Sequence, residues 1–295
     1  MQNRSLFDFI GNTPLVKAQH ILAKKNISLY LKLEGNNPGG SVKDRAAYNM
    51  ISSALERKEI KKGDYLIEAT SGNTGIALAM IAQQFGINIE LVMPENSTKE
   101  RIQTMEAYGA KVTLSPTSLG IEGSREYAEN NVKEKGYLML NQFANDDNWK
   151  AHYKTTGPEI WNDTNGEITH FISAMGTTGT IMGTSTYLKE KNNAIQIIGA
   201  QPTDNSKIPG IRKWSPEFLP KIFNPKKVDQ IIEVSEDEAR IMTKRLAKEE
   251  GIFAGMSSGG AVAAALKLAE TIDKGVLVAI ICDRGDRYLS SDLFE

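Results

Sequence analysis

Four loops rich in glycine, serine and threonine constrain the fold of this chain most, because each leads into a predicted α-helix and three of them directly follow a predicted β-strand. The residues before each loop are mostly apolar, and those after it place apolar side chains at every third or fourth position. A chain in which strands and helices alternate in this way folds into largely parallel sheets covered by helices on both faces. The four loops comprise residues 36–45, 70–75, 176–180 and 255–260.

The predicted elements belong to a chain of 295 residues, which is long enough for about two domains. A domain boundary is expected near residue 145, in the polar run Asn145-Asp146-Asp147-Asn148. Open parallel sheets bind ligands at the carboxyl ends of their strands, which is where the four loops lie. Strands are expected at residues 27–34, 65–69, 87–93, 111–114, 168–172, 195–200 and 275–281, and helices at residues 45–51, 76–82, 97–108, 237–250 and 260–272.

Composition and charge argue against several classes of protein. The 35 basic and 36 acidic residues give a net charge of −1, so neither nucleic acid nor an anionic membrane is expected as a partner. No apolar stretch reaches the roughly eighteen residues of a membrane span, and the N-terminal residues lack the apolar core of a signal peptide. The single cysteine, Cys282, cannot form an internal disulfide, so we expect a cytoplasmic protein. His20, His152 and His170 have no metal-ligand spacing, and no metal is expected.

Lys43 lies in the first of the four loops, directly before a predicted helix. A helix N-terminus carries a partial positive charge, which favours the neutral amine over the ammonium by about 0.3–1 kcal/mol. That is less than one pKa unit, so burial would have to lower the pKa further. The neutral amine is the form of lysine that adds to a carbonyl group. A lone lysine is more often a solvated surface residue, and the other loops decide between the two interpretations.

The loop of residues 176–180, Gly-Thr-Thr-Gly-Thr, is suited to bind an anion. Its small residues allow backbone N–H groups and threonine hydroxyls to close on a phosphate at a helix N-terminus. It has neither the lysine of a Walker A loop nor the Gly-x-Gly-x-x-Gly spacing of dinucleotide-binding loops, which favours a phosphate monoester. The loop of residues 70–75, Thr-Ser-Gly-Asn-Thr-Gly, adds a carboxamide and suits a small carboxylate. Taken singly, the loop of residues 176–180 is equally well interpreted as a tight turn, and that of residues 70–75 as an N-cap.

Together, the loops of residues 36–45, 70–75 and 176–180 resemble those of the fold-type II pyridoxal phosphate enzymes, in particular the O-acetylserine sulfhydrylases, or cysteine synthases. The resemblance covers nearly the whole chain. It implies a tryptophan synthase β-like α/β fold, in which two three-layer domains with parallel or mixed sheets enclose the active site in the cleft between them. The smaller, mobile domain would comprise residues 40–145 and hold the substrate carboxylate. The larger domain, residues 1–39 and 146–295, would hold pyridoxal 5'-phosphate.

Two further stretches, residues 206–214 and 281–290, are similar to the B branch of the cysteine synthases. The A branch usually has small residues where this chain has Arg212, Lys213 and Trp214. If Arg212 and Lys213 face the cleft, their two positive charges favour a dianionic sulfur donor such as thiosulfate over sulfide. They are equally well interpreted as a solvated basic pair.

The resemblance implies a β-replacement that converts O-acetyl-L-serine and sulfide or thiosulfate to L-cysteine or S-sulfo-L-cysteine and acetate. Lys43 would be the catalytic residue, joined covalently to the cofactor until the substrate amine displaces it. A homodimer is expected, with these small molecules as its partners. Cofactor contacts are expected from Lys43, Asn73 (ring hydroxyl), Gly176, Thr177, Thr178, Gly179 and Thr180 (phosphate), and Ser257 (pyridine nitrogen). Substrate contacts are expected from Thr70, Ser71, Gly72, Asn73, Thr74, Gln142, Gly210 and Arg212.

Three points stay open from the sequence. Another fold-type II reaction, such as serine or threonine deamination or cystathionine synthesis, is the main alternative, and a non-catalytic binder of phosphorylated ligands is a further one. Cys282 ends an apolar strand, so a buried, inert thiol is favoured over a reactive one, although the adjoining turn of residues 283–286 could bring it to the cofactor. Residues 97–108 are expected to move as a lid over bound substrate.

Overall fold

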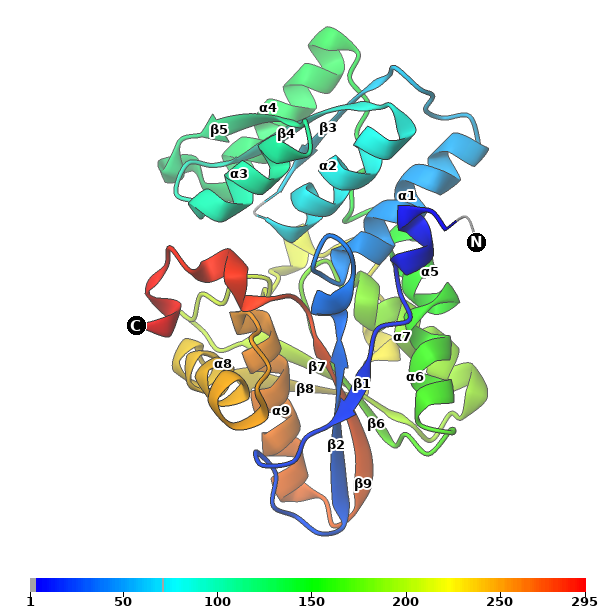
Figure 1. Ribbon diagram of the computed structural model, residues 1–295, viewed down its shortest axis with the longest axis vertical. Helices are drawn as coiled ribbons and strands as arrows, with labels where there is room; N and C mark the ends of the chain where they lie inside the picture. Colours follow the sequence, from blue (N-terminus) through cyan, green and yellow to red (C-terminus); the bar gives the residue numbers. More distant parts are fainter. Residues whose placement is uncertain (1–3, 71) are drawn as a thin grey trace.

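The computed structural model describes residues 4–70 and 72–295, which form two helix-covered sheets, the smaller above the larger in Figure 1. The strands are β1 (Leu15–Lys17), β2 (Ile27–Leu33), β3 (Tyr65–Ala69), β4 (Asn88–Pro94), β5 (Lys111–Ser115), β6 (His170–Ala174), β7 (Gln196–Pro202), β8 (Gln230–Val234) and β9 (Gly275–Ile281). The helices are α1 (Lys43–Glu56), α2 (Asn73–Phe85), α3 (Lys99–Ala107), α4 (Gly120–Lys135), α5 (Asp146–Lys154), α6 (Thr156–Asp163), α7 (Gly179–Lys191), α8 (Glu236–Glu250) and α9 (Met256–Thr271). None of the helices in these ranges is long and apolar enough to cross a membrane.

The larger sheet brings segments from both ends of the chain together. Its strand order is β1-β2-β9-β6-β7-β8, and every neighbouring pair is parallel except β1 with β2. β2 pairs with β9 from Ile27 opposite Gly275 to Leu33 opposite Ile281. The loops that follow β2, β9 and β6 therefore begin side by side, at the carboxyl ends of these parallel strands. These loops contain Lys43, Cys282 and residues 176–180.

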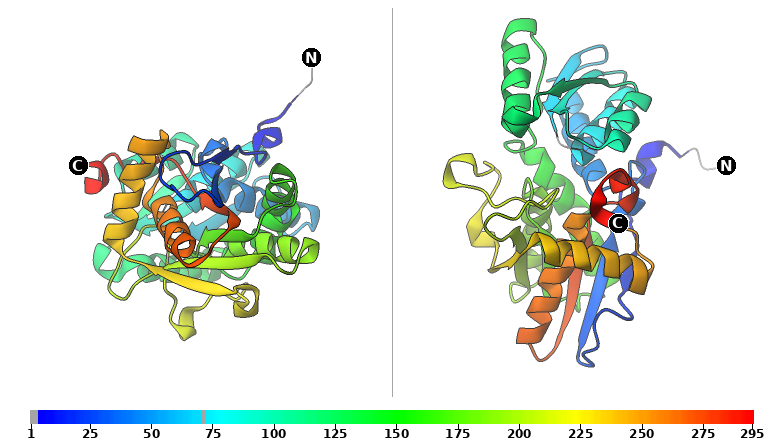
Figure 2. Two further views of the ribbon diagram at one scale, coloured as in Figure 1. Left: turned by 90° about the horizontal axis from the view of Figure 1, so that it is seen from below. Right: turned by 90° about the vertical axis from the view of Figure 1, so that its left-hand side faces the viewer.

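Helices cover both sheets on both faces (Figures 1 and 2). In the larger sheet, α9 packs on one face beside α8, and α7 packs on the other beside α5 and α6. The smaller sheet has the order β3-β4-β5 with all strands parallel, and it lies between α4 on one side and α2 and α3 on the other. α1 contacts α2 of the smaller unit and α5 of the larger one.

The structure confirms the predicted α/β class with parallel and mixed sheets. Two predicted strands, residues 65–69 and 275–281, have the predicted bounds, and the others begin or end within two residues of them. β8, α4, α5 and α6 lie in segments for which no element was specified. The polar run at 145–148 forms the cap and first turn of α5, where the Asn145 side chain accepts a 3.0 Å hydrogen bond from the Asp147 backbone. The division into residues 40–145 and the remainder stays a prediction, and each sheet lies wholly within one of the two parts.

Candidate active site

A cavity of about 970 Å³ is lined by loops of both units, and a second one of about 50 Å³ adjoins it. Loops that follow β2, β3 and β6 contribute to the lining of the large cavity, and the start of α9 contributes to the small one. Five residues line both cavities: Lys43, Asn73, Gly176, Thr177 and Gly210. The structure thus brings residues from the loops that the sequence singled out to one place.

Lys43 is the first residue of α1, and its side chain is half-buried between the two cavities. The loop before it is fixed to the end of β9, because the Val42 backbone donates a 2.8 Å hydrogen bond to the Cys282 carbonyl. Burial lowers the pKa of the Lys43 amine, and the negative charge of Asp283 offsets this only in part. Within the part of the chain that the structure describes, the amine has no hydrogen bond or ion pair. Burial therefore lowers the Lys43 pKa further, as the effect of the helix N-terminus alone was too small to do.

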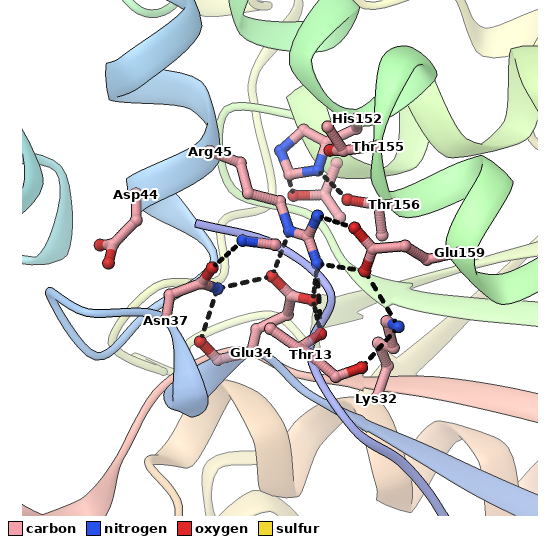
Figure 3. A network of polar contacts seen from close by, with 12 residues as sticks. Thr13, Lys32, Glu34, Asn37, Asp44, Arg45, His152, Thr155, Thr156 and Glu159 are labelled. Atoms are coloured by element: carbon pink, nitrogen blue, oxygen red, sulfur yellow. Dashed lines mark hydrogen bonds and ion pairs between the residues drawn. The ribbon is translucent and has the colours of Figure 1, made fainter. Parts of the chain in front are cut away.

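A buried ionic network holds the first turn of α1 against the larger unit (Figure 3). Arg45 makes paired hydrogen bonds of 2.7 and 2.8 Å to Glu34 and of 2.6 and 2.7 Å to Glu159. Lys32 forms ion pairs of 3.0 Å with Glu159 and 2.9 Å with Asp163. The side chains of Arg45, Glu34 and Lys32 are at most 1% exposed. Since Arg45 lies two residues after Lys43, this network fixes the position from which the amine enters the cavity.

Asn73 begins α2, and residues near the C-terminus orient its carboxamide. Its Nδ2 donates a 2.7 Å hydrogen bond to Asp283, and its Oδ1 accepts one of 2.5 Å from Arg287. Asp283 also accepts a 2.7 Å hydrogen bond from the Tyr288 hydroxyl, and Arg287 donates to the Gly39 carbonyl. No role was predicted from the sequence for Asp283 or Arg287. The feature of the sequence that could have indicated a role is that both charged residues follow an apolar strand.

The loop of residues 176–180 has free hydrogen-bonding capacity for an anion. Thr178 caps α7 with a left-handed φ of 70°, and its buried Oγ1 has no partner among the described residues. The Thr177 hydroxyl accepts hydrogen bonds from the Gly179 backbone at 3.3 Å and from Asn148 at 3.2 Å. None of the described residues that line the small cavity is a carboxylate. A phosphate monoester fits these residues, which include Gly176 to Thr178 and Thr180.

Close approach requires glycine at two positions in the small cavity. A Cβ at Gly176 would lie 2.7 Å from the Gly210 carbonyl oxygen, and Gly210 itself has a φ of 89°. A Cβ at Gly210 would lie 3.2 Å from that of Ser257. Ser257 is buried in the first turn of α9 and lines the same cavity.

Most of the residues expected to hold the substrate carboxylate line the large cavity and not the small one. Thr70 accepts 3.2 Å hydrogen bonds from the backbones of Gly72 and Gly75, and Thr74 donates one of 2.7 Å to Gln142. Thr70, Gly72, Thr74 and Gln142 all line this cavity, whereas Ser71 lies outside the described residues.

Glu68 supports the segment that carries Gln142. It is buried on β3 and accepts a 3.1 Å hydrogen bond from the Asn141 backbone. Burial raises the pKa of Glu68 to about 7, although hydrogen bonds from the backbones of Asn141 and Gln142 oppose the shift. A carboxyl whose pKa is higher in the folded state stabilises the fold below its unfolded pKa of about 4.3, and this contribution is lost as the pH rises towards 7.

We therefore expect Glu68→Gln to change the pH dependence of stability. Compared with the wild type, the variant should gain unfolding free energy as the pH rises from about 5 to 7, because it has no carboxyl to ionise. Urea denaturation at several pH values measures this difference. Parallel stability curves for the two proteins would contradict it.

Arg212 and Lys213 do not act as a pair. Arg212 is half-buried in the wall of the large cavity, with its guanidinium 5.5 Å from the centre of the Trp214 ring, and burial lowers its pKa. Lys213 is exposed at the rim, where it forms 2.7 Å ion pairs with both Asp204 and Glu233. Arg212 thus faces the cavity, whereas the charge of Lys213 is compensated by Asp204 and Glu233.

Cys282 lines the small cavity, which settles a point that the sequence left open. Burial raises the pKa of its thiol to about 12, and the negative charge of Asp283 acts in the same direction. The residue is therefore a protonated, weakly nucleophilic thiol at neutral pH. No group of three or more His, Cys, Asp and Glu side chains in the described ranges could hold a metal ion.

Comparisons with known proteins agree with this geometry. The family model described as "Pyridoxal-phosphate dependent enzyme" matches residues 6–283. Cysteine synthase B of Pseudomonas aeruginosa is 56% identical over 295 residues, which are 100% of this chain and 99% of that protein. Cysteine synthase B of Escherichia coli strain K12 is 54% identical over 97% of this chain and 94% of that protein. The crystal structure of cysteine synthase (OASS) from Entamoeba histolytica superposes with a TM-score of 0.92 at 37% identity, covering 100% of this chain and 92% of that one.

Proposed function

The chain belongs to the family of pyridoxal-phosphate-dependent enzymes, and on this premise we propose that it makes cysteine by β-replacement. The substrate is O-acetyl-L-serine, the acetate group leaves, and a sulfur nucleophile takes its place. With sulfide the product is L-cysteine, and with thiosulfate it is S-sulfo-L-cysteine. The reaction is a group transfer, and the enzyme is a transferase.

The position and state of Lys43 carry this proposal. Its amine has a lowered pKa and lies between a cavity fitted to a phosphate and a larger one open to a substrate. An amine there can bind the aldehyde of the cofactor and exchange protons with a substrate in the larger cavity. When bound, pyridoxal phosphate withdraws electrons from the substrate's α-carbon, which acidifies the α-proton and promotes loss of a β-substituent.

We assign the cofactor contacts to the walls of the small cavity. Residues Gly176 to Thr180 hold the phosphate with threonine hydroxyls and the N-terminal N–H groups of α7. Asn73 holds the ring hydroxyl, for which one of its two Nδ2 protons remains after the bond to Asp283. Ser257 meets the pyridine nitrogen with a neutral hydroxyl, so no carboxylate holds a proton on that nitrogen.

We assign the substrate carboxylate to the loop of residues 70–75 and to Gln142. Thr70, Gly72, Asn73 and Thr74 lie at the start of α2, where backbone N–H groups and the helix dipole favour an anion, and Ser71 is included by its place in the loop. Lys43 then removes the α-proton from the bound substrate and later returns a proton there. Gly210 and Arg212 lie beside the position of the incoming sulfur nucleophile.

The visible absorption spectrum of the purified protein tests the proposal. We expect a band of bound pyridoxal phosphate that changes when O-acetyl-L-serine is added and returns when sulfide is supplied, with release of acetate and cysteine. Product analysis with sulfide, thiosulfate and homocysteine separates this reaction from cystathionine synthesis, and formation of pyruvate would indicate serine deamination. A protein that binds the cofactor and leaves O-acetyl-L-serine unchanged would be the non-catalytic binder instead.

Arg212 favours thiosulfate as the sulfur donor, because it places in the cavity wall a positive charge that forms no ion pair among the described residues. We expect Arg212→Gln to lower kcat/KM for thiosulfate about tenfold or more and that for sulfide by about twofold at most, since charge-assisted hydrogen bonds to the dianion are lost. Lys213→Gln is the matched control, because the charge of Lys213 is already paired with Asp204 and Glu233. Equal losses with both donors in Arg212→Gln would contradict the assignment.

Three finer proposals concern the protein as a whole. We propose that residues 40–145 move as a unit, with 97–108 closing over bound substrate, which ligand-dependent hydrogen exchange in α3 would reveal. We propose a homodimer, which sedimentation equilibrium tests. We propose a cytoplasmic location on the basis of the single, protonated cysteine, and cell fractionation tests it.

A further inference from the structure

Helix α5 lies directly behind the loop of residues 176–180. Asn148 and His152 are one turn apart on α5 and are both buried. Two glycines of α7 permit the close contact: a Cβ at Gly179 would lie 2.1 Å from Asn148 Oδ1, and one at Gly183 would lie 2.7 Å from His152 Cβ. The two side chains of α5 therefore meet the hydroxyls of the loop without intervening atoms.

Asn148 determines the direction in which the Thr177 hydroxyl donates. The Thr177 oxygen accepts hydrogen bonds from Asn148 Nδ2 at 3.2 Å and from the Gly179 backbone at 3.3 Å. A hydroxyl oxygen has two acceptor sites and one proton. Because both acceptor sites are occupied, the proton of Thr177 is available only to a further acceptor, such as a phosphate oxygen in the small cavity.

The tautomer of His152 determines whether the Thr180 hydroxyl, like that of Thr177, can donate its proton to a phosphate. His152 Nδ1 lies 2.9 Å from Thr156 Oγ1 (Figure 3). Its Nε2 lies 3.3 Å from Thr180 Oγ1. Burial, together with the positive charge of Arg45, lowers the pKa of His152 well below 6.5, so the ring is neutral and has one N–H. If Nδ1 carries the proton, Thr180 must donate to Nε2, and its hydroxyl has no proton for a phosphate. If Nε2 carries it, Thr180 accepts from the ring and can donate to the phosphate.

We propose that Asn148 and His152 are positioning residues of the phosphate site, and that bound phosphate selects the Nε2–H tautomer of His152. Thr156 then donates to Nδ1 and fixes this tautomer from the far side. The proposal rests on the proposed function only in that the phosphate belongs to the cofactor. It assigns a role to a buried histidine that binds no metal and takes no proton from substrate.

Nitrogen NMR of the protein labelled with ¹⁵N-histidine tests the tautomer directly. The chain has three histidines, so the signals of His152 can be assigned by comparison with the variants His152→Gln and His170→Gln. In the protein loaded with pyridoxal phosphate, we expect a protonated Nε2 and an unprotonated Nδ1 for His152. A protonated Nδ1 in the loaded protein would overturn the proposal.

Cofactor affinity provides a second readout that a merely structural role would not alter. His152→Phe removes the donor to Thr180, and we expect it to weaken binding of pyridoxal phosphate about tenfold, as expected for loss of a hydrogen bond to a charged group. His152→Gln can place an amide N–H near the position of Nε2 and should recover most of the affinity. Neither variant should alter the affinity for pyridoxal, which has no phosphate.

His170→Phe is the matched control, because His170 Nδ1 also lies 2.8 Å from a threonine hydroxyl, that of Thr169, but lines neither cavity. It should leave both affinities unchanged. An equal loss of pyridoxal and pyridoxal phosphate binding in His152→Phe would show a general structural defect and refute the inference. A wild-type protein that takes up no pyridoxal phosphate would instead refute the proposed function, and the tautomer would then be read with inorganic phosphate as the probe.

Discussion

Replacing Lys43 by alanine is expected to abolish covalent attachment of pyridoxal phosphate and to lower the turnover of O-acetyl-L-serine by at least about 100-fold. General acid–base catalysis by a positioned side chain contributes about 10²–10⁴-fold, and Lys43 also supplies the covalent bond to the cofactor. Within the described residues, its amine has no competing ion pair, and burial favours the neutral, reactive form. The loss should therefore appear in kcat and not only in cofactor affinity.

Two measurements check this prediction. Borohydride reduction of the loaded wild type, followed by peptide mapping, should place the label on the peptide with Lys43 and leave Lys32 unlabelled, because the ammonium of Lys32 is held by Glu159 and Asp163. Lys207→Ala is the control for turnover, since Lys207 is an exposed lysine at the rim of the same cavity. A Lys43→Ala protein with near wild-type turnover would exclude the proposed mechanism.

Replacing Arg45 by methionine is expected to lower the unfolding free energy by about 3–5 kcal/mol, the usual loss when one partner of a buried ion pair is removed. Among the described residues, Glu34 would be left buried without a cationic partner, and Lys32 would be the one cation still paired with Glu159. Although burial raises the pKa of Glu159, the hydrogen bonds and charge of Arg45 hold it at about 2. This contribution is thus present above the unfolded pKa of about 4.3 and is lost as the pH falls towards 2.

Urea denaturation at pH 7 measures the effect, and Arg245→Met provides the control. Arg245 makes the same paired hydrogen bonds, of 2.7 and 2.8 Å, to Glu249, but both side chains are about one-third exposed. Exposed pairs of this kind contribute about 0.3–0.5 kcal/mol. Adding Glu34→Gln to Arg45→Met should recover part of the lost stability. A loss below about 1 kcal/mol in Arg45→Met would show that the network contributes little to folding.

Much of the architecture could be predicted from local patterns. Strands such as Gly275–Ile281 have a continuous apolar run that is typical of a buried strand, and the glycine-rich loops at strand ends mark where a parallel sheet binds its ligand. α4 was missed because its sequence is largely polar and buries only Ser124, Ala128 and Asn131. β1 was not specified as an edge strand because three residues carry too little periodicity to show their direction.

The candidate site was predictable where a loop carries its own chemistry, as at Lys43 and residues 176–180. It was not predictable where a side chain acts through a distant partner. Asp283 and Arg287 reach Asn73 across more than 200 residues of sequence, and His152 reaches Thr180 across 28. Such contacts depend on how α5, α7 and the C-terminal turn pack together. No spacing within the sequence encodes them.

Two potential nucleophiles, Lys43 and Cys282, line the small cavity. Desolvation acts on both in the same physical direction, since it favours whichever protonation state has no charge. For an amine the uncharged state attacks carbonyl carbon, whereas for a thiol it is the unreactive one. The same buried environment thus favours the reactive form of the Lys43 amine and the unreactive form of the Cys282 thiol. An aldehyde bound there is expected to react with Lys43 and not with Cys282.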